Sequence, residues 1–356
     1  MIRNGLLSAC AVSVSAALIL GILYGAEFLL NPHGELVESW RGGRMVHRWS
    51  DTLPVHGRVG DDLYTWGHVV KNNRYGFRER EFESPKPPGV LRVMVLGDSL
   101  TWGTGLAVEE RYTAVAEDLL NRASNDSAFE VLNFGLEGIS TADQRDILEA
   151  YKDLVEPDLI VVGFCFNDPK PRSLNYSFER ETLRQSMTGR VVERTRELGR
   201  RAGLYFLAEL QRHGFYVAAE AAGLIPGWQT ALRRSYAPSS DNWLAFVRAL
   251  RDIKATSDTL GLPAPVFAVL NQGRRSSDYL APDGYLVQYL AWYRQAEAAA
   301  RDAGFAAYNH EREIPRRIRN EPMDVNALDE HPAANLNRVF GEKLHLEVVE
   351  AFGTRR

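Results

Sequence analysis

The stretch VMVLGDSLT at residues 93–101 sets the pattern for the body of the chain. Its first four residues, Val93–Leu96, form a short apolar run with β-branched side chains, which predicts a strand. Gly97 stops the run, and the polar pair Asp98-Ser99 follows it directly. Further along, Glu109–Ala123 has apolar residues at helix spacing, so a predicted helix follows the predicted strand.

The same alternation of strand and helix continues to the C-terminus. Four more strands are predicted, at Phe129–Phe134, Asp158–Phe164, Val266–Leu270 and Phe305–Tyr308. Four more helices are predicted, at Thr141–Val155, Asp241–Leu260, Tyr285–Ala303 and Ala333–Phe352. Asp158–Phe164 is almost continuously apolar, as expected for a strand buried on both faces. Repeated β-α units predict an α/β fold, a three-layer α/β/α domain around a five-stranded parallel sheet.

Residues 169–240 interrupt this alternation and are interpreted as a helical insertion within a domain that spans 91–356. Their first part, Arg180–Arg201, is polar and rich in arginine, and their second part, Leu204–Leu224, is apolar and helical. Charged side chains within the apolar part argue against a second membrane span. It is a lid over an acyl pocket, a face resting on a bilayer, or a helix packed on the body. Residues 31–90 are rich in Pro, Gly and charge and form a linking segment with room for short strands.

An uncharged run of 22 residues, Gly5–Ala26, lies near the N-terminus. As a helix it is about 33 Å long, enough to cross a hydrocarbon core of about 30 Å. A cleavable signal peptide has a shorter apolar core of about 7–15 residues. The lipobox-like residues before Cys10 precede most of the apolar run instead of following it. We therefore expect residues 1–30 to be an uncleaved membrane anchor, with the body extracytoplasmic (periplasmic).

Composition excludes several classes of protein. The 356 residues carry 42 Lys+Arg against 46 Asp+Glu, so the basic surface of a nucleic-acid binder is not expected. Two cysteines, Cys10 and Cys165, exclude a disulfide scaffold and a four-cysteine zinc site. The eight histidines lack metal-ligand spacing, so no metal is expected. The oligomeric state stays open.

Residues that can perform chemistry follow the predicted strands. In an open parallel sheet, ligands bind at the carboxyl ends of the strands. Ser99 follows the first strand, Gly135 the second and Asn167 the third, while Asp329 and His331 precede the last helix. A serine, a histidine and an aspartate are the parts of a nucleophilic hydrolase, because a serine hydroxyl needs a neighbouring base to remove its proton.

The motifs GDSL, N-x-G, N-D and D-x-H-P, in this order, resemble those of the SGNH, or GDSL, hydrolase superfamily. The resemblance covers about 91–356 and implies a flavodoxin-like fold and no cofactor. It also implies that Ser99 is the nucleophile, His331 the general base and Asp329 the residue that orients the imidazole. The implied oxyanion hole consists of the N–H groups of Ser99 and Gly135 and the side-chain amide of Asn167.

This sequence departs from the family pattern at two places. Cys165 occupies the glycine position of the usual G-x-N-D block, and its apolar surroundings indicate a buried side chain instead of a nucleophile. The acid of the family often lies three residues before the histidine, where this chain has Leu328. Asp324 is therefore the second candidate for the acid, and His310 is a second, less favoured candidate for the base.

One further motif lies in the linking segment. Asn73-x-x-Gly76-Phe77-Arg78 resembles a motif seen before the serine block in one group of these hydrolases, and we assign it no catalytic role. The expected function is hydrolysis of an acyl or O-acetyl ester of a lipid or a cell-surface carbohydrate through an acyl-serine intermediate. The alternatives are an O-acyltransferase that uses the same site, and a non-catalytic glycan-binding scaffold that keeps the fold.

Overall fold

The computed structural model describes residues 2–30, 63–66, 68–124, 127–170, 178–273, 275, 279–280, 284–319, 321–326 and 329–353. Most of the linking segment, residues 31–62, lies outside this part of the chain, as do residues 171–177 of the predicted insertion and Leu328.

The centre of the domain is a five-stranded sheet, which confirms the predicted α/β fold. Its strands are β3 (Val90–Gly97), β4 (Ala128–Gly135), β5 (Leu159–Phe164), β6 (Val266–Val269) and β7 (Ala306–Asn309). All neighbours are parallel, in the order β4-β3-β5-β6-β7. This is the order of flavodoxin-like sheets, whose ligands bind where the order reverses, between the first strand and its two neighbours. The strand ends of β3, β4 and β5 therefore define the place for a site.

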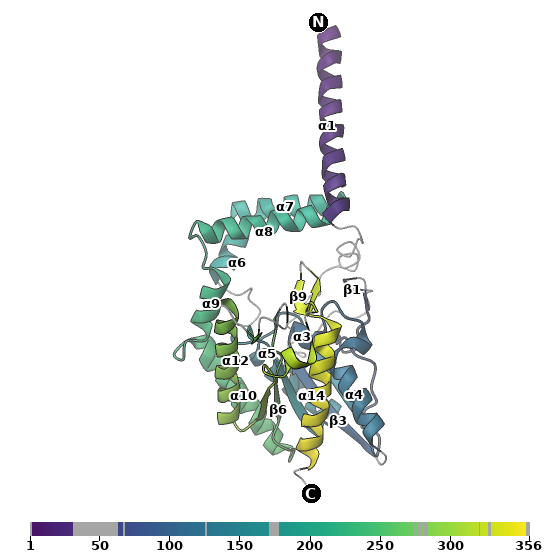
Figure 1. Ribbon diagram of the computed structural model, residues 1–356, viewed down its shortest axis with the longest axis vertical. Helices are drawn as coiled ribbons and strands as arrows, with labels where there is room; N and C mark the ends of the chain where they lie inside the picture. Colours follow the sequence, from purple (N-terminus) through teal and green to yellow (C-terminus); the bar gives the residue numbers. More distant parts are fainter. Residues whose placement is uncertain are drawn as a thin grey trace.

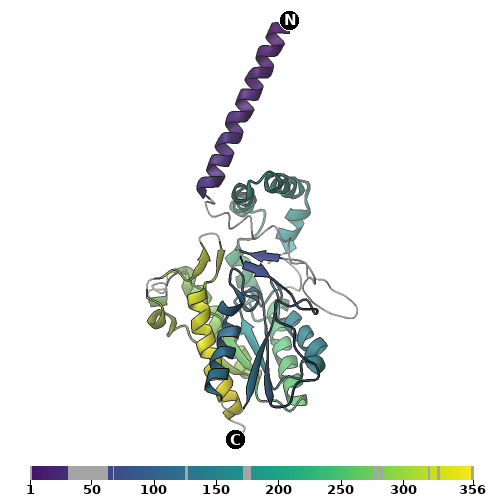
Figure 2. The same cartoon turned by 90° about the vertical axis from the view of Figure 1, so that its right-hand side faces the viewer.

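Helices cover both faces of the sheet (Figure 2). One face carries α4 (Tyr112–Ala123) and α14 (Ala334–Gly353). The other carries α5 (Thr141–Val155), α10 (Asp241–Thr259) and α12 (Gly284–Asp302). The first of these helices begins at Tyr112 and not at Glu109, because Val108–Glu110 forms a separate 3-10 turn.

The alternation of side chains along β3 explains why both faces must be covered. Val93 and Val95 belong to the apolar cluster that includes α4 and α14. Met94 and Leu96 belong to the cluster on the opposite face, with α5, α10 and α12. All four side chains are fully buried, as the apolar run of the sequence predicts.

Short elements gather at the carboxyl end of the sheet (Figure 1). Helix α3 (Ser99–Trp102) follows β3 directly. Two antiparallel hairpins lie near it: β1 (Leu63–Thr65) with β2 (His68–Val70), and β8 (Asp324–Asn326) with β9 (Asp329–Pro332). The linking segment thus contributes strands to the end of the domain that carries Ser99.

Helix α1 (Ile2–Leu30) projects away from this same end of the domain (Figure 1). By length and composition, its stretch Ser13–Leu30 is long and apolar enough to cross a membrane. The region 178–235 forms α6 (Phe178–Gln185), α7 (Met187–Arg201), α8 (Tyr205–Ala221) and α9 (Trp228–Ser235). The α7–α8 pair lies at the foot of α1, apart from the sheet and its covering helices, so α8 packs on α7 and α1 instead of on the body (Figures 1 and 2).

Candidate active site

Ser99 occupies the first position of α3, immediately past the end of β3. Asp98 caps this helix, because its Oδ1 accepts the N–H of Leu100 at 3.0 Å. The N–H groups in the first turn of a helix have no carbonyl one turn earlier to bond. The N–H of Ser99 is therefore placed to bind an oxygen beside its own hydroxyl.

Three glycines at the same level of the sheet let α3 approach the strands closely. Gly97 pairs with both Gly135 and Gly163 in register. A Cβ on Gly97 would lie 1.9 Å from Thr101 Oγ1, and a Cβ on Gly135 would lie 2.5 Å from the backbone nitrogen of Trp102. Both distances are far inside van der Waals contact, so the position of Ser99 depends on glycine at these strand ends.

His331 joins the serine to an aspartate. Its Nε2 lies 2.8 Å from Ser99 Oγ, and its Nδ1 lies 2.5 Å from Asp329 Oδ1. Both His331 and Asp329 belong to β9, and Asp329 Oδ1 also accepts the backbone N–H of His331 at 3.0 Å. With the imidazole neutral, Nδ1–H donates to Asp329 and Nε2 accepts the Ser99 hydroxyl, which is the arrangement that activates a serine.

The two charged partners shift each other's pKa in opposite directions. Burial alone would raise the pKa of Asp329, but the charge and hydrogen bonds of His331 lower it to about 2. Burial alone would lower the pKa of His331, but the charge and hydrogen bond of Asp329 raise it to about 9. Asp329 therefore stays ionised, and protonation of His331 competes with its action as a base at neutral pH.

Trp66 is a residue of the site that the sequence did not reveal. Its indole Nε1–H donates to Asp329 Oδ2 at 2.5 Å, on the carboxylate oxygen that His331 does not use. Trp66 follows β1 and has a φ of 48°, in the left-handed region that bulky residues rarely adopt. The hairpin of the linking segment therefore holds the Asp329 carboxylate, over a separation of 263 residues that no local pattern reveals.

The other two predicted oxyanion donors lie beside α3. Gly135 ends β4, next to the end of β3, but its N–H donates to Asn133 Oδ1 at 2.9 Å. Asn133 also donates to the carbonyl of Thr101, so it connects β4 to α3. Asn167 follows β5 and is buried, and its Oδ1 finds no hydrogen-bond partner within the described residues. The structure therefore brings Ser99, Gly135 and Asn167 to adjacent strand ends, with the Gly135 N–H engaged within the protein.

The N-x-x-G-F-R motif binds the loop that follows α3. Asn73 Oδ1 accepts the N–H of Phe77 at 3.1 Å and closes the turn. The buried guanidinium of Arg78 donates to the carbonyls of Gly103 and Leu106 at 2.6 and 2.5 Å, just after α3. Burial, with the charge of Arg111, lowers the pKa of Arg78 to about 9. The hydrogen bonds of Asn73 and Arg78 thus fix the loop after α3, which follows Ser99.

The other residues considered from the sequence form no hydrogen bond with Ser99 or His331 within the described residues. Asp324 lies on β8, paired in register with Pro332, while Asp329 makes the contact with His331. His310 Nε2 lies 2.5 Å from Glu347 Oε1, so this imidazole bonds to a carboxylate of α14 and not to Ser99. Cys165 is buried, and burial raises the pKa of its thiol well above the ordinary value, which makes it unreactive.

Glu137 is a second residue that the sequence did not single out. Thr104 Oγ1, in the loop after α3, donates to Glu137 Oε1 at 2.7 Å. Burial raises the pKa of Glu137, and the charge of His331 lowers it. A carboxyl group therefore lies close enough to the triad to interact with it, two residues after Gly135.

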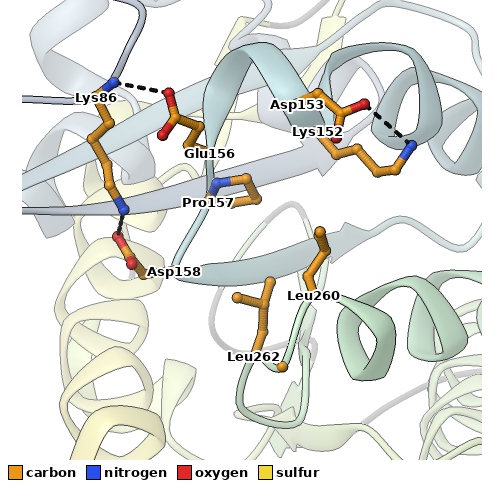
Figure 3. Close-up of a pocket in the computed structure, with 9 residues that line it drawn as sticks. Lys86, Lys152, Asp153, Glu156, Pro157, Asp158, Leu260 and Leu262 are labelled. Atoms are coloured by element: carbon orange, nitrogen blue, oxygen red, sulfur yellow. Dashed lines mark hydrogen bonds and ion pairs between the residues drawn. The ribbon is translucent and has the colours of Figure 1, made fainter.

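A cavity at the opposite end of the sheet does not serve the triad (Figure 3). It has a volume of about 450 Å³, and Asp158, which precedes β5, lines it. Its charged side chains bond to one another or to the backbone: Lys86 Nζ lies 2.6 Å from Asp158 Oδ2, and Glu156 Oε1 accepts the backbone N–H of Lys86 at 3.0 Å (Figure 3). Within the described part of the chain, no three His, Cys, Asp or Glu side chains gather closely enough to hold a metal ion.

Comparison with known proteins gives one family and several distant structures. A model of the GDSL-like lipase/acylhydrolase family matches residues 95–339. The structure of TesA is 14% identical, with a TM-score of 0.40, over 71% of this chain and 95% of its own. The acetyl xylan esterase AlAXEase is 13% identical, with a TM-score of 0.41, over 72% of this chain and 100% of its own. Axe2, an acetylxylan esterase from Geobacillus stearothermophilus, is 11% identical, with a TM-score of 0.39, over 72% and 94%. A search of curated proteins finds no match.

Proposed function

Because the chain belongs to the GDSL-like lipase/acylhydrolase family and is a carboxylic ester hydrolase, we propose that it works through an acyl-serine intermediate. Ser99 Oγ attacks the carbonyl carbon of the ester while His331 Nε2 takes its proton. The tetrahedral intermediate then collapses, and His331 returns that proton to the oxygen of the leaving alcohol. Water, activated by the same imidazole, attacks the acyl-serine and releases the carboxylic acid and free Ser99.

Asp329 and the oxyanion donors stabilise charge during these steps. Asp329 stays ionised and holds the imidazole in the tautomer that accepts the serine proton. The oxyanion binds to the N–H of Ser99 and the side-chain amide of Asn167. The N–H of Gly135 completes the set if the substrate oxygen replaces Asn133 Oδ1 as its acceptor.

The observation that carries this proposal is the chain of two contacts from Asp329 through His331 to Ser99, at 2.5 and 2.8 Å. We expect wild-type protein to be labelled by a fluorophosphonate probe, and Ser99→Ala not to be labelled at all. His331→Ala leaves the serine in place without its base, so it should label slowly. Folded wild-type protein that does not label would contradict the hydrolase mechanism and favour a glycan-binding scaffold. Equal labelling of Ser99→Ala would show that another residue is the nucleophile.

For the substrate, we propose an acyl or O-acetyl ester of a lipid or a cell-surface carbohydrate. The position of α1 at the catalytic end of the domain supports a substrate at a membrane surface (Figure 1). A screen of acetylated sugars against long-chain esters distinguishes the two classes. Addition of a sugar acceptor during turnover distinguishes hydrolysis from acyl transfer, because a transferase forms an acylated sugar instead of free acid.

We further propose that α1 is retained as a membrane anchor, with the catalytic domain extracytoplasmic. The supporting observation is that α1 bonds to the rest of the chain near its end. The Glu27 carboxylate accepts the N–H groups of Phe206 and Leu207 at 2.7 and 3.0 Å, in the first turn of α8. The Tyr24 hydroxyl donates to the carbonyl of Ala202. Cleavage after α1 would remove these partners. N-terminal sequencing of membrane-fraction protein tests this, because an N-terminus beyond residue 30 would exclude an anchor.

A further inference from the structure

Helices α7 and α8 form a flat pair at the foot of α1. Figure 1 shows both running roughly perpendicular to α1, and Figure 2 shows them end-on, side by side. Arg196 Nε of α7 lies 2.5 Å from Glu209 Oε1 of α8, and Gln211 Nε2 donates to Thr195 Oγ1 at 2.6 Å. If α1 crosses a bilayer, a pair with this orientation lies along the plane of the membrane surface.

One side of this helix pair packs against α6. The ring of Tyr216 on α8 lies under the guanidinium of Arg180 on α6, 4.4 Å from its centroid. Tyr216 and Ala219 are buried with Ile225, and Leu183 of α6 packs on them. This contact identifies the side of α8 that faces α6 and the body.

The opposite side of both helices is apolar and exposed. We define the platform face as the apolar side chains of α7 and α8 that are at least half exposed and recur at helix spacing. They are Met187, Val191 and Leu198 on α7, and Leu210, Val217 and Leu224 on and just after α8. On α8 the same stripe continues with Gly214 and Ala221, both exposed, so it contains no charge. Six exposed apolar side chains on adjacent helices form a patch of the kind that marks an interaction site.

Arginines lie within and beside the platform face on α7: Arg194 stands at helix spacing between Val191 and Leu198, and Arg190 lies beside this row. This helix carries five arginines and two glutamates. Arg190 and Arg194 lie on its exposed side, and neither forms an ion pair with any residue that the structure describes. Interfacial helices combine an apolar face with Arg or Lys at its border, where the cations meet anionic lipid headgroups.

We propose that the α7–α8 pair rests in the membrane–water interface, with the platform face in the bilayer and Arg190 and Arg194 against anionic headgroups. The proposal rests on α1 as the anchor of the proposed function, since α1 brings the bilayer to this face. Glu27 fixes the angle between the two parts, because its carboxylate binds the start of α8. The platform then holds the catalytic end of the domain toward the lipid surface.

The test uses the full chain in liposomes of phosphatidylcholine with about one-third phosphatidylglycerol. Single cysteines carry an environment-sensitive fluorophore in a Cys10→Ala background, since Cys165 is buried. Leu198→Cys and Val217→Cys report on the platform face, and Leu18→Cys reports on α1. Leu260→Cys is the matched control, an exposed leucine just after α10 at the opposite end of the domain.

We expect lipids with a shallow quencher to quench the labels on Leu198→Cys and Val217→Cys by at least half and leave Leu260→Cys unchanged. Adding Arg190→Glu and Arg194→Glu should weaken the quenching in vesicles that contain phosphatidylglycerol. Platform labels that behave like Leu260→Cys while Leu18→Cys is quenched would overturn the platform but keep the anchor. Leu18 lies about 18 Å along α1 from its end at Leu30, so its label is tested with lipids that carry a quencher deep in the acyl chain. A label on Leu18→Cys that this deep quencher leaves unquenched would overturn the anchor of the proposed function, whatever the esterase activity.

Discussion

Replacing Trp66 with phenylalanine removes one hydrogen-bond donor from the acid of the proposed triad. The indole Nε1–H donates to Asp329 Oδ2 at 2.5 Å, while His331 uses the other carboxylate oxygen. Phenylalanine keeps the apolar ring and leaves that oxygen without its partner. Because the role proposed for Asp329 is to orient the imidazole without contacting substrate, we expect kcat to fall and KM to stay unchanged.

The size of the effect follows from the hydrogen bond that is lost. A hydrogen bond to a charged group contributes about 1.5–3 kcal/mol. The side chain of Asp329 is 15% exposed, so water can replace part of the lost bond and the lower end of the range applies. Since about 1.4 kcal/mol changes a rate tenfold, kcat for Trp66→Phe should fall about tenfold.

Hydrolysis of p-nitrophenyl acetate measures this effect, with Trp228→Phe as the matched control. That substitution also removes an indole hydrogen bond, to Tyr289 Oη at 3.0 Å, but outside the triad, and kcat should not change. Trp66→Phe in an Asp329→Asn background should cost less than in wild type, because the two residues act as one unit. Full additivity, or an unchanged kcat with normal thermal stability, would refute the inferred role of Trp66.

Three further predictions concern other parts of the molecule. kcat/KM should rise with pH, with the midpoint of the rise near 9, because only neutral His331 acts as a base. Asp329→Asn should lower both kcat/KM and this midpoint. A wild-type midpoint near 6.5 would contradict the effect of Asp329 on the pKa of His331. In urea titrations, Gly135→Ala should lower the free energy of unfolding by about 1–3 kcal/mol, because the new Cβ meets the backbone of α3. Gly214→Ala is the control: its Cβ meets open space, so it should raise the free energy of unfolding by about 0.5–1 kcal/mol. Equal stabilities of the two variants would refute the close packing of α3. Glu27→Ala should remove about 1 kcal/mol from the start of α8 and speed hydrogen exchange there about fivefold, and unchanged exchange would mean that the carboxylate does not cap this helix.

The sequence predicted the sheet because its strands are local apolar runs. Each of the five strands contains or overlaps its predicted run, since a strand buried on both faces needs consecutive apolar residues. The start of the helix predicted at Glu109 was wrong by three residues, because Val108–Glu110 satisfies its own hydrogen bonds as a 3-10 turn. Such boundaries depend on capping contacts and not on periodicity.

The candidate site was predicted to the extent that its residues follow strands. Ser99 and Asn167 follow β3 and β5, and Gly135 ends β4, so the parallel sheet brings them together. The motif D-x-H-P favoured Asp329 over Asp324, and the contact of Asp329 with His331 depends on the position of β9, which the sequence leaves open.

By itself, the sequence determined the order of strands and helices, the apolar N-terminal helix and the residue types of a serine hydrolase, because each depends on neighbours within a few turns of chain. Only the tertiary structure decided that Trp66 binds Asp329 and that Glu27 binds the start of α8. These contacts join residues more than 170 positions apart. Contacts between residues this far apart in the sequence depend on how the whole chain packs, so local periodicity cannot predict them.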